Sequence, residues 1–257
     1  MAALTDRSGE SPAAGIPSPA ASASLFLVLL LVGDLVYIAI HLVATETTLI
    51  HSPLAALDVD RGYAEFFQYM KLLWAGLLLT CLAMRTRQWG YFAWVLSVAY
   101  LLADDSLSVH ENLGEMLANG LALHQAVGLR AVDFGELLVS AMAGAVLGAG
   151  IGWAYLRGGD AFRRSSRHLL VLVLALVFFG VGVDMMHSAL HPVGIVDKAL
   201  VILEDGGELV SISFIAWYAF LLVVAGERSR GASLPGLIGG VAAHGVSAFR
   251  SRRQAGD

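Results

Sequence analysis

Charged side chains, cysteine and proline are all scarce in this sequence. Only 14% of the 257 residues are Asp, Glu, Lys or Arg, whereas 57% are hydrophobic. An average soluble domain carries about 25% charged residues. The single cysteine, Cys81, excludes an intrachain disulfide and a cysteine-rich metal site. The composition therefore indicates an integral membrane protein.

Long apolar stretches with polar breaks between them predict an all-α fold, an integral membrane bundle of six transmembrane helices. A spanning helix needs about 20 mainly apolar residues. Six segments meet this requirement: residues 24–44, 64–84, 89–108, 132–156, 169–189 and 202–225. Residues 1–23 are polar and rich in Ala, Ser and Pro, so we expect a disordered cytoplasmic segment followed by a retained first helix, not a signal peptide.

The distribution of basic residues predicts the orientation of the bundle. Short cytoplasmic loops collect Arg and Lys. Eleven basic residues lie in segments 85–87, 157–167 and 228–253, whereas the alternate connections carry three, namely Arg61, Arg130 and Lys198. We therefore expect both termini in the cytoplasm, a basic cytoplasmic tail over residues 226–257, and residence in a bacterial cytoplasmic (inner) membrane.

Acidic and histidine side chains gather toward the predicted outer ends of the helices. A charged group in hydrocarbon is stable only when it faces the bundle interior and finds a partner. We therefore treat this set as candidate functional residues: His41 in the first helix, Asp104, Asp105, His110 and Glu111 at the end of the third, Glu136 in the fourth, Asp184, His187 and His191 in the fifth, and Glu204 and Glu208 in the sixth.

Two further polar residues, Asp34 and Lys71, lie deeper in the first and second helices. They predict either a structural salt bridge with each other or a functional pair.

The fifth segment carries the sharpest pattern, Asp184-x-x-His187-x-x-x-His191. This i, i+3, i+7 spacing aims three side chains in one direction if the helix persists to Pro192. Gly180 and Gly182 precede the pattern within one turn and could loosen the helix there, but small residues also let helices pack closely, which is the more common role.

Clustered imidazole and carboxylate groups suggest a site for a divalent metal ion, since these ligands suit Zn, Fe or Mn. The expected ligands are Asp104, Asp105, His110, Asp184, His187, His191 and Glu204. Glu111 and Glu208 are the expected general bases. A metal ion that activates water would make the protein an intramembrane hydrolase of lipid-like substrates.

The order Ser106-x-x-x-His110, then Asp184, then His187-x-x-x-His191 resembles the signature of the ceramidase and adiponectin-receptor superfamily of membrane hydrolases. The resemblance implies hydrolysis at a membrane metal site. It covers only these five residues, and proteins of that superfamily usually have seven spans with the paired histidines in the last.

Two other functions fit the same sequence. Carboxylate and histidine chains serve as proton relays, so the protein could transport protons or divalent cations. Alternatively, Gly144, Gly148 and Gly152 form a double Gly-x-x-x-Gly ridge, which predicts close contact with another helix of the bundle or with a second copy in a homo-oligomer. In that case the protein is a membrane scaffold. The expected partners are membrane lipids, and we expect no nucleic acid.

A second resemblance covers most of the chain. With the runs Leu102-Ala103-Asp104-Asp105-Ser106, Asp133-Phe134-Gly135-Glu136, Gly182-Val183-Asp184 and Glu204-Asp205-Gly206-Gly207-Glu208, the sequence resembles an uncharacterised family of bacterial multi-pass proteins from Gly62 to about Ala225. That resemblance implies a multi-pass membrane fold and brings no established activity with it.

Overall fold

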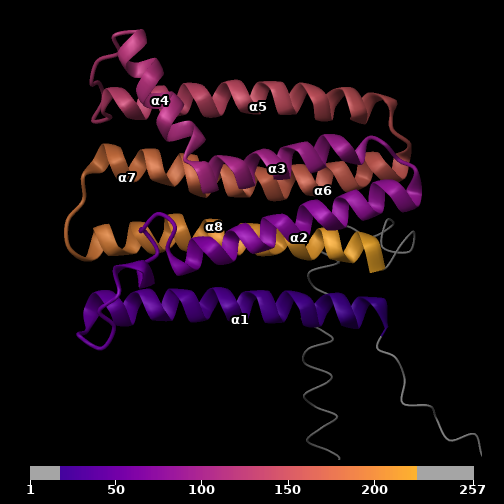
Figure 1. Ribbon diagram of the computed structural model, residues 1–257, viewed down its shortest axis with the longest axis horizontal. Helices are drawn as coiled ribbons and strands as arrows, with labels where there is room; N and C mark the ends of the chain where they lie inside the picture. The colour runs from indigo at the N-terminus through magenta and orange to yellow at the C-terminus, as the bar shows by residue number, and fades with distance from the viewer. Residues whose placement is uncertain (1–17, 225–257) are drawn as a thin grey trace, which may run out of the picture.

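A computed structural model describes residues 18–224 as a bundle of helices (Figure 1). The α-helices are α1 (Pro19–Glu46), α2 (Tyr63–Thr86), α3 (Tyr91–Leu107), α4 (Val109–Gly120), α5 (Ala131–Arg157), α6 (Asp160–Val177), α7 (Asp184–Leu190) and α8 (Ile195–Val224). A short 3-10 helix, η1 (Pro53–Ala55), precedes α2, and a π-helical segment, η2 (Phe178–Val183), joins α6 to α7.

Five of these helices are long and apolar enough to cross a membrane, namely α1, α2, α5, the helix Asp160–Leu190 and α8. The pair α3 and α4 also passes this test when taken together, but the two helices meet at an angle of 73°. The all-helical fold with several apolar helices is thus confirmed. The count of six spans and the orientation stay predictions. Most of the predicted leader and the predicted basic tail lie outside the described residues.

Helix α8 is the centre of the bundle and packs against α1, α2 and α6. Its residues from Leu209 to Leu222 are mostly buried, with Trp217 and Tyr218 among the largest enclosed side chains. In Figure 1, α1 and α5 lie on opposite sides of this centre. The start of α1, the end of α8 and the α2–α3 and α5–α6 connections share one end of the bundle, and α4 and α7 lie at the other.

A fully buried ion pair fastens α1 and α2 to α8. Lys71 Nζ lies 2.9 Å from Asp34 Oδ1 and donates to Leu209 O at 2.6 Å and to Ser213 Oγ at 3.0 Å. Ser213 Oγ in turn donates to Asp34 Oδ2 at 2.6 Å. The expected pairing of Asp34 with Lys71 is confirmed. Each of the three ammonium hydrogens of Lys71 has an acceptor, so the buried charge is fully hydrogen-bonded. We therefore interpret this ion pair as a structural clamp that holds α1, α2 and α8 together.

His41 also has a local structural partner. Its buried Nδ1 accepts a hydrogen bond from the backbone N–H of Leu57 at 3.0 Å, so the side chain ties α1 to the loop around η1.

Helix α5 has its fully buried residues at one end, although Ile151 and Ala154 near its other end also pack, partly buried, against the core. Its buried residues are Asp133, Gly135 and Val139, all in its first third. A Cβ placed on Gly144, Gly148 or Gly152 would meet nothing within 4 Å. The glycine ridge therefore makes no close contact with the described bundle, and self-association through it stays a prediction.

One helix boundary differs from the sequence-based expectation in a way that matters for the site. Helix α8 begins at Ile195, before the expected start at Ile202, so Glu204 and Glu208 lie well inside a continuous helix. Helix α3 ends at Leu107, within one residue of the expected end, and the chain then turns sharply at Ser108 into α4.

Candidate functional site

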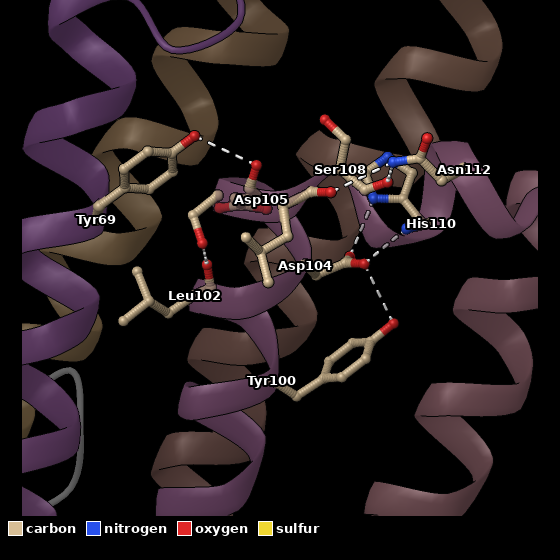
Figure 2. Close-up of polar contacts among 10 residues, drawn as sticks. Tyr69, Tyr100, Leu102, Asp104, Asp105, Ser108, His110 and Asn112 are labelled. Carbon is tan, nitrogen blue, oxygen red and sulfur yellow. Dashed lines mark hydrogen bonds and ion pairs between the residues drawn. The ribbon is translucent and has the colours of Figure 1, made fainter.

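The corner between α3 and α4 is built around Asp104 (Figure 2). Ser108 adopts a left-handed conformation, with φ of 48°, which interrupts the helix. The Asp104 carboxylate accepts the backbone N–H of His110 at 2.9 Å and lies 3.0 Å from Nδ1 of the same histidine. Tyr100 Oη donates to it at 3.4 Å. A carboxylate from one helix thus caps the next helix and holds the His110 ring beside itself.

Two glycines let α4 and α5 cross in direct backbone contact. A Cβ on Gly135 would overlap the carbonyl oxygen of Gly114, and a Cβ on Gly114 would lie 2.6 Å from Glu136 Cγ. Larger residues would force the helices apart. This crossing brings Glu136 toward the side of α4 that carries His110.

The start of α5 is fixed by a local ion pair. Arg130 donates to Asp133 through its backbone N–H at 2.7 Å and through its guanidinium at 2.6 and 2.9 Å. These hydrogen bonds to Asp133 raise the pKa of Arg130 above its ordinary value. Arg130 therefore pairs with Asp133 at the N-terminus of α5.

The π-helical segment η2 presses against α8. A Cβ on Gly180 would overlap Glu208 Oε1, and a Cβ on Gly207 would overlap the ring of Phe179. Gly180 thus permits close packing against α8, which was the favoured explanation for these glycines, and a π-turn also forms at Gly180 and Gly182. Such turns are rare and occur frequently at functional sites.

The α3–α4 corner, the α4–α5 crossing and the contact of η2 with α8 surround a pocket of about 110 Å³, which we call the acidic pocket. Its polar lining consists of Asp104, Asp105, His110, Glu136, Ser140, Asp184 and Glu208. Its apolar and glycine lining consists of Leu101, Leu137, Leu176, Val177, Gly180, Val181 and Met185.

The acidic pocket carries an excess of negative groups. Its five carboxylates come from α3, α5, α7 and α8, and no Lys or Arg of residues 18–224 lines it. His110 is already paired with Asp104. Within the described part of the chain, no hydrogen bond reaches the carboxylates of Asp105, Glu136, Asp184 or Glu208. Glu208 is partly buried, and its carboxylate lies beside Gly180, which also lines the pocket.

The structure brings together six of the candidate residues predicted from sequence. They are Asp104, Asp105, His110, Glu136, Asp184 and Glu208. Glu111 is exposed on α4 and does not line the pocket.

His187 and Glu204 form a separate group beside the pocket. His187 Nδ1 lies 2.8 Å from Glu204 Oε2, and its Nε2 lies 3.1 Å from Asp197 Oδ1. Asp197 precedes the segment 202–225 that the sequence predicts as the sixth span. The sequence does not predict that Asp197 pairs with His187, because the two residues lie on opposite sides of the α7–α8 turn and the sequence does not specify the path of that turn.

His191 does not join either group, and the expected alignment of Asp184, His187 and His191 does not form. Helix α7 ends at Leu190, and His191 has a left-handed backbone with φ of 46°. The cause is Pro192, since a proline disfavours helical conformation in the residue before it. The His191 side chain is exposed and lies 3.3 Å from Ala189 O.

Among residues 18–224, no three His, Cys, Asp or Glu side chains are arranged to hold one metal ion. The donor types suit a divalent metal, but these side chains do not form a preorganised metal centre as they stand.

No curated protein and no solved structure matches the chain. A family model does match, and it covers residues 23–224. Its description is a domain of unknown function, DUF8692, and the chain belongs to this family.

Proposed function

We propose that this membrane protein binds a cation in the acidic pocket and that its function is to take up and pass on that cation within the membrane. One observation carries the proposal: carboxylates from four different helices line a single pocket that holds no Lys or Arg of the described residues. A scaffold has no evident need for such an arrangement.

Electrostatics supports this proposal. Several carboxylates that share a small pocket repel one another, and the repulsion is stronger in the low dielectric of a protein interior than in water. The paired His110 offsets only part of the negative charge. Protons or a bound cation must supply the rest, so the pocket is suited to exchanging one for the other.

A second candidate is the metal-dependent hydrolase of lipid-like substrates. The support for it is the pair His110 and Asp104, which puts an imidazole nitrogen and a carboxylate on one wall of the pocket. Nitrogen and oxygen ligands of this kind suit Zn, Fe or Mn. Elemental analysis of purified protein tests it: a stoichiometric metal that is lost in Asp104→Ala would favour this candidate over the first.

Calorimetric titration tests the first proposal. Full-length protein in phosphatidylcholine nanodiscs is titrated with Mn²⁺ and, separately, with tetramethylammonium. We expect at least one of them to bind, and Glu208→Gln to weaken that binding by about tenfold, which corresponds to ~1.4 kcal/mol. Glu115→Gln is the matched control, because Glu115 is an exposed carboxylate on α4 that does not line the pocket. Equal binding by all three proteins, or no binding by any, would contradict the proposal.

A further inference from the structure

The lining of the acidic pocket combines two chemically different kinds of side chain. Five are carboxylates, and the carboxylate of Glu208 has no hydrogen-bond partner among the described residues. Five others are hydrocarbon side chains, namely Leu101, Leu137, Leu176, Val177 and Val181. A ligand that fills such a pocket gains from a positive charge and from apolar surface together.

Two of the apolar residues that line the pocket, one on α5 and one on α6, are exposed. Leu137 of α5 and Val177 of α6 both line it, yet they are 38% and 44% exposed. Beyond Val139, no residue of α5 is buried. The exposed neighbours Leu138 and Phe178 continue this apolar surface. In a bundle that lies in a bilayer, such a surface faces lipid, so the pocket is accessible from the hydrocarbon layer.

A small inorganic ion does not use both the carboxylate and the hydrocarbon lining of this pocket. Divalent metals need several ligands at fixed distances, and the described side chains form no group of three that provides them. An ammonium group is less demanding, because its attraction to carboxylates does not require fixed coordination geometry.

We infer that the ligand is an amphiphilic cation, a molecule with one ammonium head group and a hydrocarbon chain, which enters from the bilayer between α5 and α6. This inference rests on the proposed function and specifies its substrate class. The ammonium group lies among Asp105, Asp184 and Glu208. The chain lies against Leu137, Val177 and Val181 and continues into the lipid.

Spin-labelled amphiphiles test the inference. Two nitroxide probes of equal chain length are compared in nanodiscs, one with a trimethylammonium head group and one with a carboxylate head group. Electron paramagnetic resonance reports the fraction of each probe that the protein immobilises. We expect the cationic probe to associate about tenfold more strongly than the anionic one, and Glu208→Gln to reduce this preference to about twofold. Glu115→Gln should keep the wild-type preference.

A second variant examines the lipid-side entrance. Val177→Trp places a bulky ring at the mouth without changing any carboxylate. It should reduce immobilisation of the cationic probe while leaving calorimetric binding of tetramethylammonium unchanged. If Glu208→Gln fails to fold, this variant still decides the question.

The outcomes separate the inference from the proposed function. Binding of Mn²⁺ or tetramethylammonium that depends on Glu208, without any preference for the cationic amphiphile, would overturn the inference and leave the proposed function standing. A failure of all cations to bind would overturn both.

Discussion

Asp104 in α3 caps the backbone of His110 in α4 at 2.9 Å, and the two side chains are also paired at 3.0 Å. One carboxylate therefore both turns the chain and orients the only imidazole of the acidic pocket. Removal of a capping oxygen costs about 1 kcal/mol, and loss of a hydrogen bond to a charged group adds about 1.5–3 kcal/mol.

We expect Asp104→Ala to lower the free energy of unfolding by about 2.5–4 kcal/mol on this basis. Asp104→Asn keeps an acceptor for the His110 N–H and should lose less. Tyr100→Phe removes only a hydrogen bond of 3.4 Å and serves as the control. Denaturant unfolding in detergent micelles measures all three. If Asp104→Ala is no less stable than Tyr100→Phe, the capping role is wrong.

The buried pair of Asp34 and Lys71 predicts a different pattern. Lys71→Met leaves an uncompensated carboxylate in the core and should cost about 3–5 kcal/mol. The double variant Asp34→Leu with Lys71→Met removes both charges and should recover most of that loss.

The control for this pair is Lys198→Met, which breaks the half-exposed ion pair with Glu46 and should cost less than about 1 kcal/mol. The same unfolding assay applies. A double variant as unstable as the Lys71→Met single variant would show that the clamp is needed as a charged unit.

Gly180 and Gly182 offer a matched test of the carboxylate position. A Cβ on Gly180 would overlap Glu208 Oε1, whereas a Cβ on Gly182 would approach Phe178 Cδ2 at 3.7 Å, an ordinary contact. We expect Gly180→Ala to weaken cation binding by about tenfold, because the Glu208 carboxylate must move. Gly182→Ala should bind within about twofold of wild type. Calorimetry as above measures both, and equal affinities would indicate that the position of Glu208 does not matter for the ligand.

The open glycine ridge on α5 leads to a prediction about self-association. If a second copy packs there, Gly148→Leu should reduce the dimer fraction, because close helix approach requires small residues. Cys81 is the only cysteine and is exposed on α2, so a fluorophore attached to it reports association by energy transfer between copies. Val146→Leu, on an exposed position of the same helix, is the control. If the wild-type protein shows no energy transfer between copies, the prediction of a homo-oligomer is wrong.

Much of the fold could be predicted from apolar run length alone, because the membrane requires about 20 apolar residues per span. The helix boundaries were harder to predict from the sequence. The start of α8 at Ile195 was missed because Asp197 and Lys198 interrupt the apolar pattern there, although they lie on a continuous helix. The corner at Ser108 depends on Asp104 turning back toward a residue six positions later, which no local propensity indicates.

For the candidate site, the sequence predicts how far along its helix each residue lies, but not the direction in which its side chain points. The position of Asp104, Asp184 and Glu208 along their helices indicated that they lie at similar depth, and the structure puts them in one pocket. Which side chains point inward depends on helix rotation. His187 faces Glu204 and Asp197 instead of the pocket, although it lies only three residues after Asp184.

A π-turn contains one more residue than an α-turn, so residues before and after η2 are rotated relative to an unbroken helix. Each residue of an α-helix is rotated by about 100° from the one before it, so one extra residue changes the direction of every side chain that follows. Asp184 directly follows η2 and lines the acidic pocket. Segment η2 therefore sets the rotation at which the end of this helix presents its carboxylate to the neighbouring helices.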